Sequence, residues 1–279
     1  MISAPSEPRW RGRLELEYRQ DAAGRTRLTR TKHEGPLRVQ RAFAQADGSC
    51  HTYILYPPGG LVGGDELAIH AAVREGGRAL VTTPGAAKFY RSAGPQALQR
   101  VEIHVDDGAS LEWLPQESIA FAGTRTRCTT TIDLDPTARL VLWDIVCLGR
   151  PAAGEAFERG SLEQRLQVRI GGRPRWLEHA RYGESSNLGR APCGMRGLPV
   201  TGTLLCHPAR PAWLDALREV VEARSGNALR GVTVVGDLLV CRYLGTHTED
   251  ARACLTAVWS AFRQLSDRSE RVLPRVWAT

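Results

Sequence analysis

Asp144 is the residue whose surroundings most restrict its chemistry. It interrupts an apolar run that extends from Leu140 to Leu148. An ionised carboxylate in an apolar interior costs several kcal/mol unless it is paired or hydrogen-bonded. We therefore expect Asp144 to face solvent, to pair with a cation such as Arg150, or to line a polar internal passage. Cys147, in the same run, has the chemistry of a soft metal ligand but is expected to be a buried, inert thiol.

A glycine-rich block from Tyr56 to Asp65 holds four glycines and two prolines. Such a block is typical of tight turns and also of loops that cradle phosphate. It has neither the GK[ST] ending of a Walker loop nor the G-x-G-x-x-G spacing of a dinucleotide-binding loop. Turn chemistry alone favours a connection where two backbone segments pass closely. One alternative stays open: an enzyme that binds a phosphoester or nucleotide at this block, with Lys88 as the anion contact.

Other residues that could act as acids or metal ligands give weaker evidence of a functional site. Glu112 and Glu117 have the chemistry of acids or weak metal ligands, but glutamates usually stay exposed, so we expect both at the surface. Glu178 and His179 are neighbours in a predicted strand, and strand neighbours point to opposite faces, which disfavours a shared metal ion. The sequence has no G-x-S-x-G elbow and no C-x-x-C pair, so it indicates neither a catalytic nucleophile nor a preformed zinc site.

Charge and composition disfavour several classes of protein. The net charge is +7, but the arginines are scattered along the chain and only 6% of the residues are aromatic. A nucleic-acid groove needs a clustered basic face with interleaved aromatic side chains, so nucleic-acid binding is disfavoured. No apolar stretch reaches about 18 residues, and the polar N-terminus lacks the core of a signal peptide. We expect a cytoplasmic protein without a membrane span, whose seven widely spaced cysteines are reduced.

The elements that must position these residues are mostly strands in the first two thirds of the chain. Alternation of apolar and polar residues predicts the strands, and glycine-rich turns predict two hairpins. One hairpin turns at Gly171-Gly172 and the other at Gly236-Asp237. The expected strands are 14–18, 101–105, 129–134, 166–170, 176–180, 231–235 and 238–243.

Two helices are predicted near the end of the chain. The first begins at Pro211, and the second starts near Thr246, where Glu249 fits a capping box. Segment 189–211, rich in proline and glycine, is expected to be a long loop or a hinge. Because strands do not alternate with helices, a parallel βαβ sheet is disfavoured. The expected fold class is mainly β: an elongated multi-stranded β-body, β-helix-like or sandwich-like and antiparallel or coiled, with two α-helices in the C-terminal half.

Five blocks of the sequence stand in a characteristic order. They are Gly35–Gln40, Pro57–Asp65, Thr82–Arg91, Trp113–Glu117, and Gly149-Arg150 with Gly154-Glu155 and Phe157. Together they resemble the urease accessory protein UreD family, also called UreH. The resemblance is strongest from Gly35 to Phe157 and fades to a general likeness after that. Five ordered blocks are more specific than any one of them alone.

This resemblance implies a scaffold rather than an enzyme, with a single domain over residues 1–279 and no tightly bound cofactor. Family members bind urease apoprotein and work with UreF and the GTPase UreG to deliver nickel to the urease active site. The resemblance also implies an internal passage as the route of the metal. Asp65, Asp144 and Glu178 are then the expected polar groups along a nickel passage, because transient carboxylate contacts suit a metal in transit.

Overall fold

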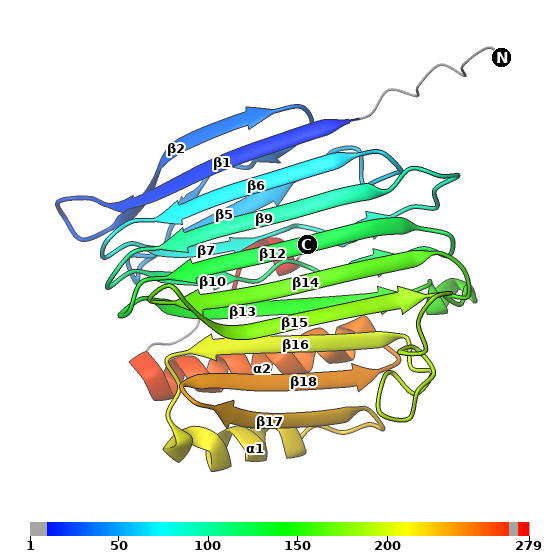
Figure 1. The fold of residues 1–279 in the computed structure, drawn as a ribbon. Coiled ribbons are helices and arrows are strands. Elements are labelled where there is room, and N and C mark those ends of the chain that lie inside the picture. The colour runs from blue at the N-terminus through cyan, green and yellow to red at the C-terminus, as the bar shows by residue number, and fades with distance from the viewer. Residues whose placement is uncertain (1–9, 268–272, 279) are drawn as a thin grey trace.

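The computed structural model describes residues 10–267 and 273–278. Its main feature is a pair of β-sheets that lie face to face, with two helices behind the larger sheet (Figure 1). The chain passes from one sheet to the other and back, so alternate strands in the sequence become parallel neighbours in space. The result is a solenoid-like β-body, and the expectation of a mainly β fold with two helices is confirmed.

The smaller sheet has seven strands. Its central pairings are parallel, and an antiparallel hairpin forms each edge. The strands are, in order across the sheet, β15 (Arg173–Gly183), β14 (Ser161–Ile170), β12 (Arg125–Leu134), β9 (Ala97–Val105), β6 (Glu66–Val73), β1 (Arg11–Gln20) and β2 (Thr26–Glu34).

The larger sheet combines a parallel part with an antiparallel part. The strands along its main path are β17 (Leu229–Val235), β18 (Leu238–Gly245), β16 (Val200–His207), β13 (Arg139–Leu148), β10 (Ser110–Trp113), β7 (Arg78–Thr82), β5 (Cys50–Leu55) and β3 (Arg38–Val39). The short strands β4 (Phe43–Ala44), β8 (Ala87–Phe89) and β11 (Ser118–Ala120) pair beside this path. Pairing is parallel from β5 to β13 and antiparallel from β13 to β17.

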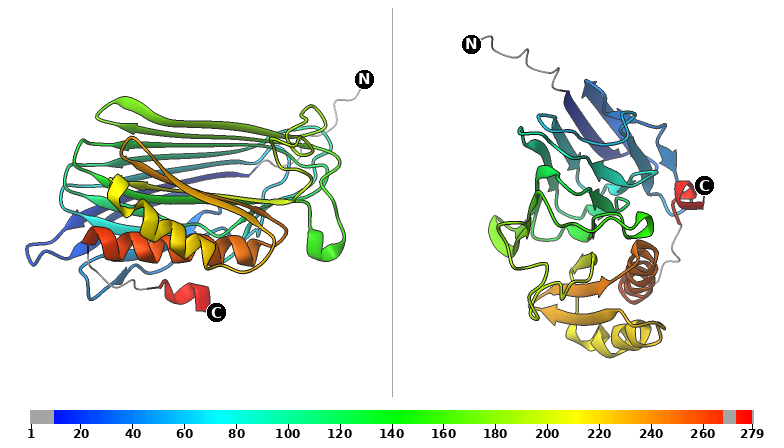
Figure 2. Two further views of the ribbon diagram at one scale, coloured as in Figure 1. Left: turned by 90° about the horizontal axis from the view of Figure 1, so that it is seen from below. Right: turned by 90° about the vertical axis from the view of Figure 1, so that its right-hand side faces the viewer.

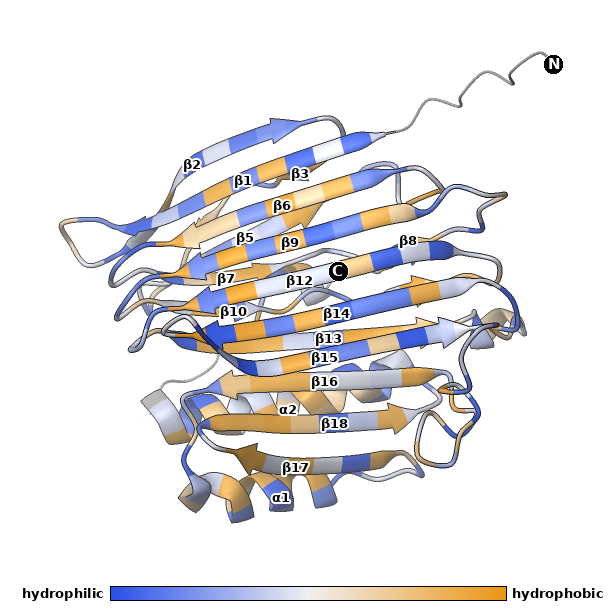
Figure 3. Ribbon diagram, in the orientation of Figure 1, coloured by the Kyte–Doolittle hydropathy of each residue, from blue (hydrophilic) through white to orange (hydrophobic). Residues whose placement is uncertain are grey.

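Alternating side chains divide each strand of the smaller sheet between core and surface. Leu14, Ile69 and Val101 are paired across three neighbouring strands and are all buried between the sheets. Most of the residues that alternate with them along the same strands are polar, and Figure 3 shows the resulting bands of hydrophobic and hydrophilic colour. This period of two is the pattern that the sequence displayed, and it fixes which side chains face the space between the sheets.

A second apolar core lies on the outer face of the larger sheet. The helices α1 (Leu214–Glu222) and α2 (Thr248–Asp267) cover this face, and both views of Figure 2 show them on one side of the molecule. The structure also has three short 3-10 helices, η1 (Pro151–Ala153), η2 (Pro211–Trp213) and η3 (Arg275–Ala278). None of the helices in the described ranges is long and apolar enough to cross a membrane.

The local predictions differ in outcome. Both hairpins are confirmed as β14–β15 and β17–β18. Both helices are present, although α1 starts at Leu214 after a 3-10 turn at the predicted start Pro211, and α2 starts at Thr248, two residues after the predicted start at Thr246. The prediction of a loop across segment 189–211 is wrong for Val200–His207, which forms the central strand β16. Because β16 is buried on both faces, its sequence has no alternation to reveal it.

Candidate functional site

Two of the predicted acidic residues meet between the sheets. Asp144 of β13 lies on one rung of the larger sheet with Thr203 of β16 and Arg242 of β18. Glu178 of β15 comes from the smaller sheet and faces this rung, where its carboxylate contacts Arg242. The strand period places His179, the neighbour of Glu178, on the opposite face, where it contacts Glu163. The expectation that Glu178 and His179 point apart is therefore confirmed.

Asp144 is not paired with Arg150. Arg150 contacts Glu155 instead, and the Asp144 Oδ2 atom accepts a hydrogen bond from Gln164 Nε2 at 2.9 Å. Burial, and then the nearby negative charge of Glu178, raise the pKa of Asp144 to about 6. The hydrogen bond from Gln164 opposes this rise only in part. Asp144 is thus a partly buried acid whose ionised form is poorly compensated.

Glu178 has a cation on one side only. Its Oε1 atom accepts a hydrogen bond from Arg242 Nη1 at 2.6 Å, and the same nitrogen donates to Thr203 Oγ1 at 2.7 Å. The guanidinium also lies over the ring of Trp176, 5.3 Å from its centroid. The second carboxylate oxygen of Glu178, Oε2, is buried and has no hydrogen-bond partner among the described residues. A buried acceptor without a hydrogen-bond donor is uncommon in folded proteins and needs an explanation.

Two cavities meet at this carboxylate pair. A small pocket is lined by Asp144, Gln164 and Glu178 among other residues. A larger cavity of about 460 Å³ shares Asp144 and Gln164 with it and extends between the sheets as far as Gly60 and Lys88. The shared lining residues place the two cavities next to each other, between the glycine-rich block and Glu178. Asp144 therefore lines both of these cavities.

The glycine-rich block forms one end of the larger cavity. The N–H of Leu61 donates to the carbonyl of Lys88, and the N–H of Tyr90 donates back to the carbonyl of Leu61. A Cβ atom on Gly60 would lie 2.6 Å from the Lys88 carbonyl oxygen and 2.5 Å from the Tyr90 ring. The prediction of a close passage between two backbone segments is therefore confirmed, and glycine at position 60 is what permits it.

Asp65 lies in a different environment from the other two acids. Its carboxylate accepts hydrogen bonds from the backbone N–H of Trp10 at 3.1 Å and of Val62 at 3.0 Å. These contacts close the turn that precedes β6 and tie it to the start of β1. Burial, followed by the charge of Asp65, raises the pKa of the cavity-lining Tyr56 to about 12. Asp65 thus holds the turn next to the glycine-rich end of the larger cavity, while Asp144 lines both cavities and Glu178 lines the small one.

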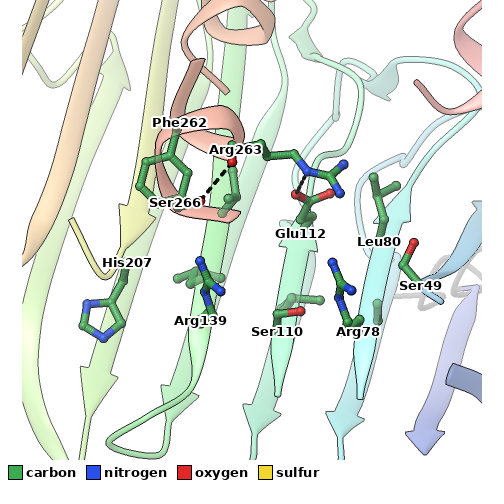
Figure 4. A pocket seen from close by; sticks show the side chains of 14 residues that line it. Ser49, Arg78, Leu80, Ser110, Glu112, Arg139, His207, Phe262, Arg263 and Ser266 are labelled. Carbon is green, nitrogen blue, oxygen red and sulfur yellow. Dashed lines mark hydrogen bonds and ion pairs between the residues drawn. The ribbon is translucent and has the colours of Figure 1, made fainter. Parts of the chain in front are cut away.

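The expectation that Glu112 and Glu117 are exposed is wrong. Glu112 accepts a hydrogen bond from the indole Nε1 of Trp259 at 2.9 Å. It also forms an ion pair with Arg263 of α2 at 3.6 Å (Figure 4). Arg263 is almost fully buried and also contacts Asp47 at 3.0 Å. The side chain of Glu117 is 15% exposed and faces Arg252 of α2 at 3.6 Å. Both glutamates are therefore largely buried and bind side chains of α2.

Several residues of the site were missed by reasoning from the sequence. Thr203 and Arg242 belong to strands brought beside Asp144 only by the tertiary fold. Gln164 had a signal, because it is the polar member of the inward series Leu162, Gln164 and Leu166. Another cluster with metal-ligand chemistry, His104 with Asp106 and Asp135, lies at the outer surface of the smaller sheet and was not predicted either.

Most of the cysteines lie away from Asp144 and Glu178. All seven cysteines are free, and all but Cys193 are buried. Cys128 faces the larger cavity, and its pKa is raised strongly by burial and further by the charge of Asp144. A thiol in this state is a poor nucleophile and a poor metal ligand. Cys147 is also buried with a raised pKa, as expected for an inert thiol.

Comparison with known proteins identifies the family. The model of the family described as UreD urease accessory protein matches residues 11–278. A urease accessory protein UreD of Dechloromonas aromatica is 44% identical to this chain, with 100% of this chain and 98% of that protein covered. The Klebsiella aerogenes UreD is 41% identical, with 99% of each protein covered. The Pseudomonas fluorescens UreD is 44% identical, with coverage of 98% and 96%. The chain therefore belongs to the urease accessory protein UreD family.

Proposed function

We propose that this protein delivers nickel to urease apoprotein during assembly of the metal centre, acting with UreF and UreG as a scaffold and not as an enzyme. The observation that carries the proposal is the meeting of Asp144 and Glu178 where two internal cavities join. Nickel then moves along the larger cavity and makes transient contacts with the two carboxylates. The protein acts in the cytoplasm, as one domain, without a tightly bound cofactor.

The chemistry of the pair suits a metal in transit. Two carboxylates offer hard oxygen ligands, whereas thiolates would bind a late transition metal more tightly and release it more slowly. The described cavity walls offer no thiol with a lowered pKa, because Cys128 is held in its neutral form by burial. Asp65 contributes from the rim, where it fixes the turn that closes the cavity.

The test is activation of urease in a reconstituted system. The chain is produced with UreF, UreG and urease apoprotein, and nickel-dependent urease activity is measured for wild type, Asp144→Asn and Glu178→Gln. We expect both variants to join the complex but to lower activation several-fold. Asp133→Asn is the matched control, since Asp133 is an acid on the outer face of the same β-body and pairs with Arg169.

Two outcomes would contradict the proposal. If urease is activated equally well without this chain, it has no role in nickel delivery. If Asp144→Asn and Glu178→Gln activate urease as wild type does, the carboxylate pair is not on the route of the metal.

A further inference from the structure

Arg242 stands between the carboxylate pair and solvent. It comes from β18, on the same rung as Thr203 and Asp144, and its side chain is 44% exposed while that of Glu178 is 28% exposed. Its Nη1 atom bridges Glu178 Oε1 and Thr203 Oγ1. The guanidinium therefore lies beside two residues that line the small pocket, Glu178 and Thr203.

The charges around the pair are unbalanced. Asp144 and Glu178 carry two negative charges when ionised, and Arg242 is the basic side chain seen in contact with them among the described residues. The other groups that face the pair are Gln164 of β14, Tyr182 of β15, Thr203 of β16 and Cys128 of β12. None of these four brings a positive charge. One carboxylate charge is thus left without a counter-cation, and Glu178 Oε2 is left without a donor.

A guanidinium and a divalent metal ion compete for the same oxygens. An arginine paired with a carboxylate uses the lone pairs that a metal ion would use, and the two cations repel each other at short range. Arg242 is well placed to move aside, because its side chain is 44% exposed and its guanidinium already lies over the Trp176 ring on one face. Its bond to Thr203 keeps it near Glu178, so that it can return once the metal has left.

We propose that Arg242 is a resident counter-cation which a divalent metal ion displaces from Glu178, and whose return shortens the stay of the metal at the carboxylate pair. This inference rests on the proposed role of the pair in metal passage. It makes Arg242 a positioning residue that sets affinity and release. An arginine at this place keeps two acids in a partly buried site from holding too long the metal that they conduct.

The test is titration of the full chain with Ni²⁺, followed by release of the metal to EDTA in a stopped-flow instrument. Arg242→Gln removes the charge and keeps a hydrogen-bond donor, while Arg242→Lys keeps the charge. We expect Arg242→Gln to bind Ni²⁺ about tenfold more tightly, as for the loss of one nearby like charge, and to release it more slowly. We expect Arg242→Lys to stay close to wild type.

A double substitution separates this effect from a general change in folding. In a Glu178→Gln background, Arg242→Gln should no longer change affinity or release, because the contested carboxylate is gone. Circular dichroism and melting curves report whether each variant folds. Should Arg242→Gln fail to fold, Thr203→Val tests the same inference, since it removes the anchor of Arg242 without changing any charge and is expected to tighten Ni²⁺ binding to a smaller extent.

The outcomes are distinguishable. Unchanged or weaker Ni²⁺ binding by Arg242→Gln, with weaker binding by Glu178→Gln, would overturn the role of Arg242 and leave the passage in place. Equal binding by wild type, Asp144→Asn and Glu178→Gln would overturn the proposed function and this inference together.

Discussion

At the scale of single residues, ionisation of Asp144 lowers the free energy of unfolding. The pKa of Asp144 is raised in the folded state from 3.8 to about 6, so the unfolded chain gives up this proton more readily. The carboxyl group therefore favours the folded state less as pH rises from about 4 to about 6, and its cost is constant at higher pH. We expect Asp144→Asn to raise the free energy of unfolding at pH 7.5 by about 1–3 kcal/mol.

Urea denaturation of the metal-free protein at several pH values measures this difference. The gain from Asp144→Asn should shrink as pH falls from about 6 to about 4 and be absent below the pKa of the unfolded chain. Asp133→Asn, which breaks an ion pair with Arg169 at the outer surface, should show no such gain. A variant Asp144→Asn that is less stable than wild type at pH 7.5 would mean that the folded protein stabilises the ionised carboxylate.

The sequence predicted part of the candidate site and could not predict the rest. Asp144 was found because one acid in a long apolar run demands an explanation. Its partners come from β14, β15, β16 and β18, and their register decides that Gln164, Glu178, Thr203 and Arg242 meet. Register between strands distant in sequence is set by packing of the whole β-body, and no local pattern encodes it.

At the scale of elements, the attachment of α2 depends on a buried charge. Arg263 of α2 is paired with Glu112 of β10 and with Asp47, and the Trp259 indole donates to the same Glu112 carboxylate. Removing one partner leaves buried charge uncompensated. We expect Glu112→Gln to lower the free energy of unfolding by roughly 2–4 kcal/mol, as seen in urea denaturation.

The matched control is Glu102→Gln. Glu102 is on β9, the preceding strand in the sequence, which belongs to the smaller sheet. Its side chain is 49% exposed and contacts His70, so its loss should cost less than about 1 kcal/mol. Equal effects of the two substitutions would show that the Glu112 cluster does not hold α2 on the sheet.

Some strands were predictable from the sequence and others were not. The β14–β15 and β17–β18 hairpins have alternating residues and a turn with glycine at positive φ, at Gly171-Gly172 and Gly236, and both were predicted. β16 follows a proline- and glycine-rich stretch and is buried on both faces, because α2 covers one side and the β-body the other. Its strand character is thus a consequence of burial from two sides, which only the assembled fold provides.

At the scale of the whole molecule, two sheets packed face to face would normally exclude a large space. Here a cavity of about 460 Å³ persists between them, with apolar walls interrupted by Asp144 and Gln164. Such a space forfeits packing contacts that a filled core would make. The proposed role in metal passage gives a reason for short polar side chains such as Thr130 at inward positions near the cavity, where a solenoid built for stability alone would place larger apolar residues.

A large side chain placed in the cavity tests whether metal passes through it, because such a side chain can block the cavity without unfolding the protein. Thr130 of β12 faces the cavity, and its neighbour Thr129 faces outward from the same strand. We expect Thr130→Phe to occupy the space, to leave the melting temperature unchanged or raised, and to lower nickel-dependent urease activation several-fold while the complex still forms. Thr129→Phe adds the same ring outside the cavity and should activate urease as wild type does. Full activation by a folded Thr130→Phe variant would place the route of the metal elsewhere, because a ring in the cavity and a metal in transit compete for the same space.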